Sequence, residues 1–315
     1  MTDPFPAARA ADTACRVTGR GPVRVLLLHA LTGSPDAADR PGARGWWGPL
    51  FQPGAPLEED AATVWTPNLP GSCYGATAPD PGRPLSSRTQ AELLARWLVR
   101  EDLRFDALIG GSLGGMVALE LALAAPDRFG VVGVIGCGGR ADPWLWGTNE
   151  VQRAILRSPT LGDPEAIALA RRAAMLTFRS PQSLAQRFTE PEQVRGWLRH
   201  HGLDLAGRFT RASYLALLDA MDGHDLGRDR GGLVRALGGL GAPLHLLGMD
   251  SDQLFPRTAL EELATAAQRA GRLARLDWIR SPHGHDAFLM EWDQVAAWLD
   301  PLLMRPNYWE EVANS

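Results

Sequence analysis

The chain reads Phe105-Asp-Ala-Leu-Ile-Gly-Gly-Ser-Leu-Gly-Gly-Met116 near the end of its first third. Residues 110–114 form the pattern Gly-x-Ser-x-Gly, which places a serine on a tight turn between a strand and a helix. An apolar run comes directly before the pattern, and a run of small and apolar residues follows it to Ala125. Composition alone gives about 0.1 chance matches to this pattern. The context therefore favours a nucleophile, Ser112, over a glycine-rich turn.

Strand and helix patterns alternate on both sides of this segment. Short apolar runs typical of buried parallel strands occupy residues 23–29, 63–67, 105–110, 131–136, 244–248 and 276–279. Helical patterns cover residues 91–100, 114–125 and 258–271, with predicted capping boxes at Ser87/Gln90, ahead of the first, and at Thr258/Glu261. Residues 1–20 show no period and are interpreted as a loose or partly ordered lead-in. The alternation predicts an α/β fold with a mostly parallel central sheet flanked by helices.

The alternation stops between residues 141 and 235. Helical patterns follow one another there, near residues 149–156, 164–176, 191–200 and 212–221, without a strong strand pattern. We therefore predict a core built from residues 1–140 and 236–315, with a helical lid at residues 141–235 inserted into it.

Composition excludes several classes of function. The 315 residues are 45% hydrophobic and 22% charged, as in ordinary globular proteins, and the net charge of −4 predicts no nucleic-acid partner. No apolar run approaches the roughly 20 residues of a membrane span, and no signal peptide is recognised. All 32 basic residues are arginines, which excludes Schiff-base chemistry and a P-loop. Three scattered cysteines predict a reducing, cytoplasmic location.

A nucleophilic serine needs a histidine base and an acid that orients the base. With this type of turn, the acid and then the histidine follow the serine along the chain. Two histidines, His283 and His285, follow the last predicted strand, and two acids, Asp250 and Asp252, follow the strand before it. Position alone leaves both choices open. A metal site at the two histidines is disfavoured because no third ligand pattern stands nearby, so no metal is expected.

The oxyanion of an acyl-transfer reaction needs two N–H donors. The residue after the nucleophile, Leu113, supplies one, and the loop after an early strand supplies the other. The loop His29-Ala-Leu-Thr-Gly33 follows the first predicted strand, which makes Leu31 the second expected donor. His29 precedes the serine and is interpreted as structural.

Longer motifs run in order from about residue 23 to residue 295. They are His29-Ala-Leu-Thr-Gly33, Gly45-Trp-Trp47, the segment 67–79, Gly110-Gly-Ser-Leu-Gly-Gly-Met116, Asn149-Glu-Val-Gln-Arg153, the segment 208–222, Asp252-Gln-Leu-Phe255 and Gly284-His-Asp-Ala-Phe-Leu289. Together these motifs resemble those of the homoserine O-acetyltransferases, a branch of the α/β hydrolase fold. The resemblance implies that fold for the core and a lid that completes the site.

The resemblance also implies roles that spacing left open. It assigns the acid to Asp252, the base to His285, the contact with the substrate amino group to Asp286, and the contact with the substrate carboxylate to Arg171. A guanidinium suits that last role because its planar fork bonds both carboxylate oxygens. The implied reaction moves an acetyl group from acetyl-CoA, a co-substrate, to the hydroxyl of L-homoserine for methionine biosynthesis. No permanently bound cofactor is expected. The resemblance also implies a homodimer that forms through the lid helices.

Three departures from the family pattern keep alternatives open. Phe178 stands where the family has a tyrosine, Ala78 replaces a glycine, and the segment before the first strand is short, so that an early pair of strands would be missing or reduced. The alternatives are L-serine as acceptor, succinyl-CoA as donor, or a serine esterase or thioesterase on the same fold. A noncatalytic binding protein would have lost a triad residue, and none is lost here.

Overall fold

A computed structural model describes residues 14–74 and 85–304, and the replacement at residue 78 lies outside the described residues. Seven strands form one sheet in the order β1-β3-β2-β4-β5-β6-β7, in which β1 is antiparallel to β3 and the other pairs are parallel. The strands are β1 (Cys15–Thr18), β2 (Val23–Leu28), β3 (Ala62–Pro67), β4 (Phe105–Gly111), β5 (Phe129–Ile135), β6 (Leu244–Met249) and β7 (Leu273–Ile279). The predicted mostly parallel sheet is confirmed.

Strand β1 lies within residues 1–20, which were interpreted as a loose or partly ordered lead-in and for which no strand was predicted. It pairs with β3, with Cys15 opposite Pro67 and Thr18 opposite Val64. Four residues at a sheet edge are too few to show a hydrophobic period, so the pairing partner defines this strand rather than its own sequence.

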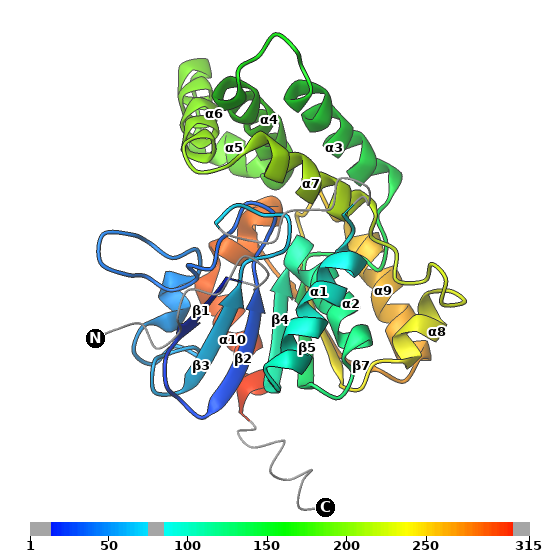
Figure 1. Ribbon diagram of the computed structural model, residues 1–315. Helices are drawn as coiled ribbons and strands as arrows, with labels where there is room; N and C mark the ends of the chain where they lie inside the picture. The colour runs from blue at the N-terminus through cyan, green and yellow to red at the C-terminus, as the bar shows by residue number, and fades with distance from the viewer. Residues whose placement is uncertain (1–13, 75–84, 305–315) are drawn as a thin grey trace, which may run out of the picture.

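Helices cover both faces of the sheet (Figure 1). The core helices are α1 (Ser87–Arg100), α2 (Leu113–Ala124), α8 (Leu233–Gly238), α9 (Arg257–Arg269) and α10 (Trp292–Leu303), with short 3₁₀ helices η1 (Gly48–Phe51) and η2 (Gly284–Leu289). Among the described residues, no helix is both long and apolar enough to cross a membrane.

Both predicted capping boxes were misplaced. The N-cap of α1 is Ser86, whose extended backbone lets its side chain accept a hydrogen bond from Thr89 N–H, while Ser87 is already helical. Helix α9 starts after Pro256 without a side-chain cap, and Thr258 lies inside it. Sequence offered two adjacent serines at α1, and only the entry direction of the chain decided between them.

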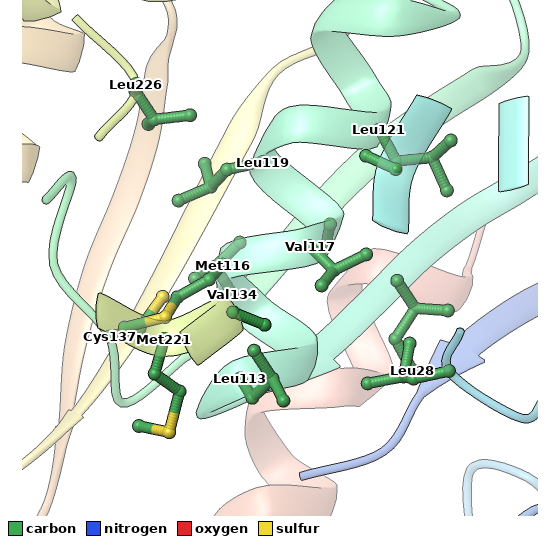
Figure 2. Packing of buried hydrophobic residues seen from close by; sticks show 14 of the residues in the cluster. Leu28, Leu113, Met116, Val117, Leu119, Leu121, Val134, Cys137, Met221 and Leu226 are labelled. Atoms are coloured by element: carbon green, nitrogen blue, oxygen red, sulfur yellow. The ribbon is translucent and has the colours of Figure 1, made fainter. Parts of the chain in front are cut away.

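Helix α2 lies in the centre of the core. Every residue from Leu113 to Ala122 is buried, which is why its sequence is apolar all round rather than on one stripe. Figure 2 shows Met116 and Val117 of this helix beside Val134 of β5 and Leu28 of β2. A second cluster of buried residues, under α10 and η1, fills the other face of the sheet. This packing fixes the junction of β4 and α2, where Ser112 stands.

Six helices follow one another between β5 and β6. We call the first five of them the lid: α3 (Pro143–Leu156), α4 (Asp163–Phe178), α5 (Pro181–Arg187), α6 (Pro191–Ala206) and α7 (Arg211–Asp222). Figure 1 shows them stacked together beyond one end of the sheet. Helix α3 begins earlier than its pattern indicated because Asp142 caps it and Pro143 suits a first turn. Helix α5, only seven residues long, had not been predicted.

Candidate active site

Ser112 occupies a strained turn between β4 and α2. Its backbone lies at φ 56° and ψ −124°, a conformation that a non-glycine residue adopts only when its surroundings enforce it. Its N–H donates to the carbonyl of Ile135 (2.8 Å), and its own carbonyl accepts from Gly115 N–H (2.9 Å). A Cβ on Gly114 would lie 2.2 Å from the carbonyl oxygen of Leu28, so only glycine fits there. The turn therefore holds the hydroxyl at the end of the strand.

The structure brings Ser112, His285 and Asp252 together. The Oγ of Ser112 lies 2.9 Å from Nε2 of His285, and Nδ1 of the same ring lies 2.7 Å from Oδ2 of Asp252. All three side chains are buried. The second carboxylate oxygen, Oδ1, accepts the backbone N–H groups of Leu254 (2.8 Å) and Phe255 (3.0 Å). The carboxylate is thus fixed from behind while it faces the imidazole.

The other two candidates take different positions. Nδ1 of His283 lies 2.9 Å from Oγ of Ser183 in the lid, and Asp250 accepts a hydrogen bond from Ser281 N–H (3.0 Å). Neither residue contacts Ser112 in the described structure. The contact with Ser112 therefore distinguishes His285 from His283, and the contact with His285 distinguishes Asp252 from Asp250, which sequence position alone could not do. Within residues 14–74 and 85–304, no group of three or more metal-ligating side chains gathers.

The charge state of His285 follows from its neighbours. Burial of the ring disfavours its charged form, but the charge and hydrogen bond of Asp252 outweigh burial, and the charge of Asp286 adds to them. The pKa of His285 is consequently raised above its ordinary value. A base with a raised pKa accepts the proton of a serine hydroxyl more readily.

The two expected oxyanion donors flank the serine. Leu113 is the first residue of α2, where N–H groups have no acceptor within the helix, and Leu31 lines the cavity beside Ser112. The loop that carries Leu31 is anchored by the buried ring of His29, which lies 2.8 Å from the Ala30 carbonyl and 3.1 Å from the N–H of Leu69. Burial lowers the pKa of His29, so the ring stays neutral. This anchoring matches the structural interpretation of His29.

A small cavity opens beside Ser112. Its wall is mostly apolar. Besides Ser112, the residues that line it are Leu31, Phe178, Leu218, Met221, Leu254, Asn149 and Gln152. The two amides belong to a buried network: Tyr214 Oη donates to Gln152 Oε1 (2.7 Å), and Asn149 Nδ2 donates to Asp222 Oδ1 (2.7 Å). The sequence analysis assigned no role to either amide. The only signal for them was the family motif at residues 149–153.

Arg171 lies beside this cavity with its guanidinium 5.0 Å from the ring of Phe178. In the described part of the chain, no hydrogen-bond acceptor contacts that guanidinium. Burial lowers its pKa, which Tyr214 and Asp286 oppose. A partly buried cation without an acceptor is a site that an anion would stabilise.

Asp286 has a partner that the sequence analysis missed. Its Oδ2 accepts a hydrogen bond from Nε of Arg179 (3.0 Å), and both side chains are largely buried. The resemblance assigned Asp286 to a substrate amino group, so a bound ammonium would share this carboxylate with Arg179. No spacing rule pairs residues 107 positions apart.

Comparisons with known proteins show what this chain is similar to in sequence and in fold. The model of the alpha/beta hydrolase family matches residues 25–298. The homoserine O-acetyltransferase of Thermus thermophilus is 41% identical over 313 residues, covering 89% of this chain and 81% of the relative. A solved homoserine O-acetyltransferase from Staphylococcus aureus has a TM-score of 0.80 at 26% identity, covering 93% of this chain and 89% of that one. A solved esterase has a TM-score of 0.79 at 16% identity, covering 92% and 93%, which shows a shared fold.

Proposed function

The chain belongs to the homoserine O-acetyltransferases of the α/β hydrolase family, and from this premise we propose that it transfers an acetyl group from acetyl-CoA to the hydroxyl of L-homoserine. The observation that carries the proposal is the continuous chain of contacts from Ser112 Oγ through His285 to Asp252. In such a chain the serine is the nucleophile, the histidine is the base and the aspartate orients the histidine.

The first half-reaction acylates the enzyme. Nε2 of His285 takes the proton of Ser112 while Oγ attacks the thioester carbonyl, and the oxyanion accepts the N–H groups of Leu31 and Leu113. The C–S bond then breaks, the proton on His285 passes to the CoA sulfur, and acetyl-Ser112 remains. In the second half-reaction His285 takes the proton of the acceptor hydroxyl while its oxygen attacks the acetyl carbonyl. The ester bond to Ser112 Oγ then breaks, and the proton on His285 passes to Oγ, which regenerates free Ser112. This sequence is a ping-pong mechanism with one covalent intermediate.

Arg171 and Asp286 are the proposed contacts with the two charged ends of the amino acid. The guanidinium of Arg171 has no hydrogen-bond acceptor among the described residues. The carboxylate of the bound amino acid would accept its N–H groups. Asp286 already holds Arg179, and its other oxygen, Oδ1, is the proposed acceptor for the ammonium group. Phe178 offers no hydroxyl at the position of the family tyrosine. Acceptor binding therefore depends more heavily on the charged pair.

The cavity supports a small, uncharged acyl group. The described side chains that line it are uncharged, and Arg171, which contacts the lining residue Phe178, is the proposed partner of the amino-acid carboxylate, so no cation of the lining is left for the free carboxylate of a succinyl group. This lining favours acetyl-CoA over succinyl-CoA as the donor. The lid over the serine limits access of water to the acyl-enzyme, which favours transfer over hydrolysis.

The family and the surface support the cellular context that we propose: methionine biosynthesis in the cytoplasm by a homodimer. The lid exposes large apolar side chains, which commonly mark interaction surfaces when they gather. They are Trp144, Trp146, Val151, Leu176 and Leu203. We assign the dimer contact to these lid helices.

A substrate matrix tests the proposal. Purified protein receives acetyl-CoA or succinyl-CoA together with L-homoserine, L-serine or water alone, and free CoA thiol is measured over time. We expect the acetyl-CoA and homoserine pair to release CoA fastest. Equal rates with water alone would identify a thioesterase, and a faster rate with serine would overturn the acceptor.

A further inference from the structure

The segment between lid helices α4 and α5 lies directly on the loop that carries the base. We call residues 282–286 the base loop and residues 179–183 the lid clasp. Three side chains of the clasp bond the loop: Ser180 Oγ donates to the carbonyl of Pro282, Ser183 Oγ lies 2.9 Å from Nδ1 of His283, and Arg179 Nε donates to Oδ2 of Asp286 (3.0 Å). These bonds span the loop on both sides of His285.

The backbones of the two segments also touch. Gly284 lies at φ +69°, and a Cβ built on it would stand 2.7 Å from the nitrogen of Ser180 and 2.9 Å from the carbonyl oxygen of Phe178. Ser180 and Ser183 are each only 4% exposed. The clasp is therefore packed without a gap, and the loop cannot shift toward the lid unless the lid moves too.

The core holds the base loop through the ring nitrogens of His285, which lie 2.9 Å from Ser112 Oγ and 2.7 Å from Asp252 Oδ2, and through two backbone N–H groups. Ser251 Oγ accepts the N–H of Gly284 (3.0 Å), and Ser281 Oγ accepts the N–H of His283 (3.1 Å). None of these core contacts reaches the side chain of Asp286 or the carbonyl of Pro282. The loop is thus held between two bodies, and the lid supplies the contacts on its outer side.

From these contacts we propose that Arg179, Ser180 and Ser183 are positioning residues that keep His285 within reach of Ser112 by fixing the base loop from the lid. The inference rests on the proposed role of Ser112 as the nucleophile. Its consequence is that the lid is part of the acid–base machinery as well as a cover for the substrate. The base is fully placed only when the lid is seated on it.

The clasp also sets the charge around the base. The charged groups that face His285 are Asp252 and Asp286, and Arg179 compensates the second of these carboxylates. Without Arg179, the uncompensated carboxylate would raise the pKa of His285 further, because a nearby negative charge favours the imidazolium. Removing the two serine hydroxyls changes no charge. The two kinds of substitution therefore predict different pH profiles.

The experiment measures the reaction of Ser112 with diisopropyl fluorophosphate, which needs the base but neither CoA nor an amino acid. Intact-protein mass spectrometry follows the rate of adduct formation across pH. The variants are Ser180→Ala/Ser183→Ala, Arg179→Gln and the charge-preserving Arg179→Lys. The control is Ser158→Ala, which removes a lid hydroxyl that bonds only its neighbour Thr160 at the surface.

We expect the double serine variant to react roughly tenfold more slowly at every pH, because small displacements of catalytic groups cost large factors in rate. The Arg179→Gln variant should show its acidic limb at higher pH, and Arg179→Lys should restore the limb of the original protein. The control should react at the original rate.

Two results would overturn the inference. One is an unchanged rate in the double serine variant, and the other is an unchanged acidic limb in Arg179→Gln, each with an unchanged Tm. If the double variant does not fold, the rate of adduct formation in Ser183→Ala alone is compared with that of the original protein by the same criterion. Failure of the unsubstituted protein to form any adduct at Ser112 would instead refute the proposed function, so the two failures are distinguishable.

Discussion

Replacing Asp252 by asparagine should invert the proton arrangement of His285. The reason lies behind the carboxylate, where Oδ1 accepts two backbone N–H groups, from Leu254 and Phe255. An asparagine must therefore keep its carbonyl oxygen at that position and turn its NH₂ group toward His285. Nδ1 of the ring then becomes an acceptor, so Nε2 carries the proton and cannot accept one from Ser112.

The expected loss follows from this inverted tautomer. In a well-studied triad the same exchange lowers turnover by about 10⁴-fold, which corresponds to about 5 kcal/mol of barrier. The cavity should keep its shape because the asparagine has nearly the same size and retains both backbone bonds. We expect loss of activity with a Tm close to that of the original protein.

The assay compares Asp252→Asn with the matched variant Asp250→Asn. The carboxylate of Asp250 accepts the N–H of Ser281, and an asparagine carbonyl can still accept that bond. Steady-state CoA release and acetyl-Ser112 formation are measured for both variants. A loss of less than tenfold in Asp252→Asn, or a greater loss in Asp250→Asn, would refute the tautomer argument.

Three further substitutions and the pH dependence have expected outcomes. Ser112→Ala should abolish the single acetyl adduct that intact-protein mass spectrometry detects with acetyl-CoA alone, and a surviving adduct would place the nucleophile elsewhere. Arg171→Ala should lower kcat/KM for homoserine by roughly 10- to 150-fold, as loss of a hydrogen bond to a charged group does, while adduct formation continues; unchanged kinetics would remove Arg171 from the acceptor site. Phe178→Tyr should lower KM for homoserine, and a KM that rises or stays constant would dissociate this position from the acceptor. Finally, the rate of adduct formation should increase with pH through a midpoint above about 6.5, the ordinary pKa of histidine. The raised pKa of His285 keeps its ring protonated to higher pH, and only the neutral ring can act as the base. A midpoint below about 6.5 would contradict the assignment of His285 as the base.

Local sequence determined the architecture and the turn that carries Ser112. Apolar runs and helical periods depend on neighbours within a few residues, so the alternation of strands and helices could be predicted, as could the turn at Ser112. Features without a local period were missed, and β1 and the N-cap of α1 are the examples. In both cases the deciding partner or chain direction lies outside the segment itself.

The tertiary structure decided which residues meet. Position left His283 and His285 equivalent, and the family resemblance selected His285; only folding brings it to Ser112, 173 positions away, and directs His283 into the lid. The roles that we assign to these site residues are predictions, and the experiments above test them. The pairing of Arg179 with Asp286 had no signal in the sequence, since one ion pair leaves no periodic trace. Periodicity encodes the elements, whereas contacts between distant residues exist only after the elements have packed.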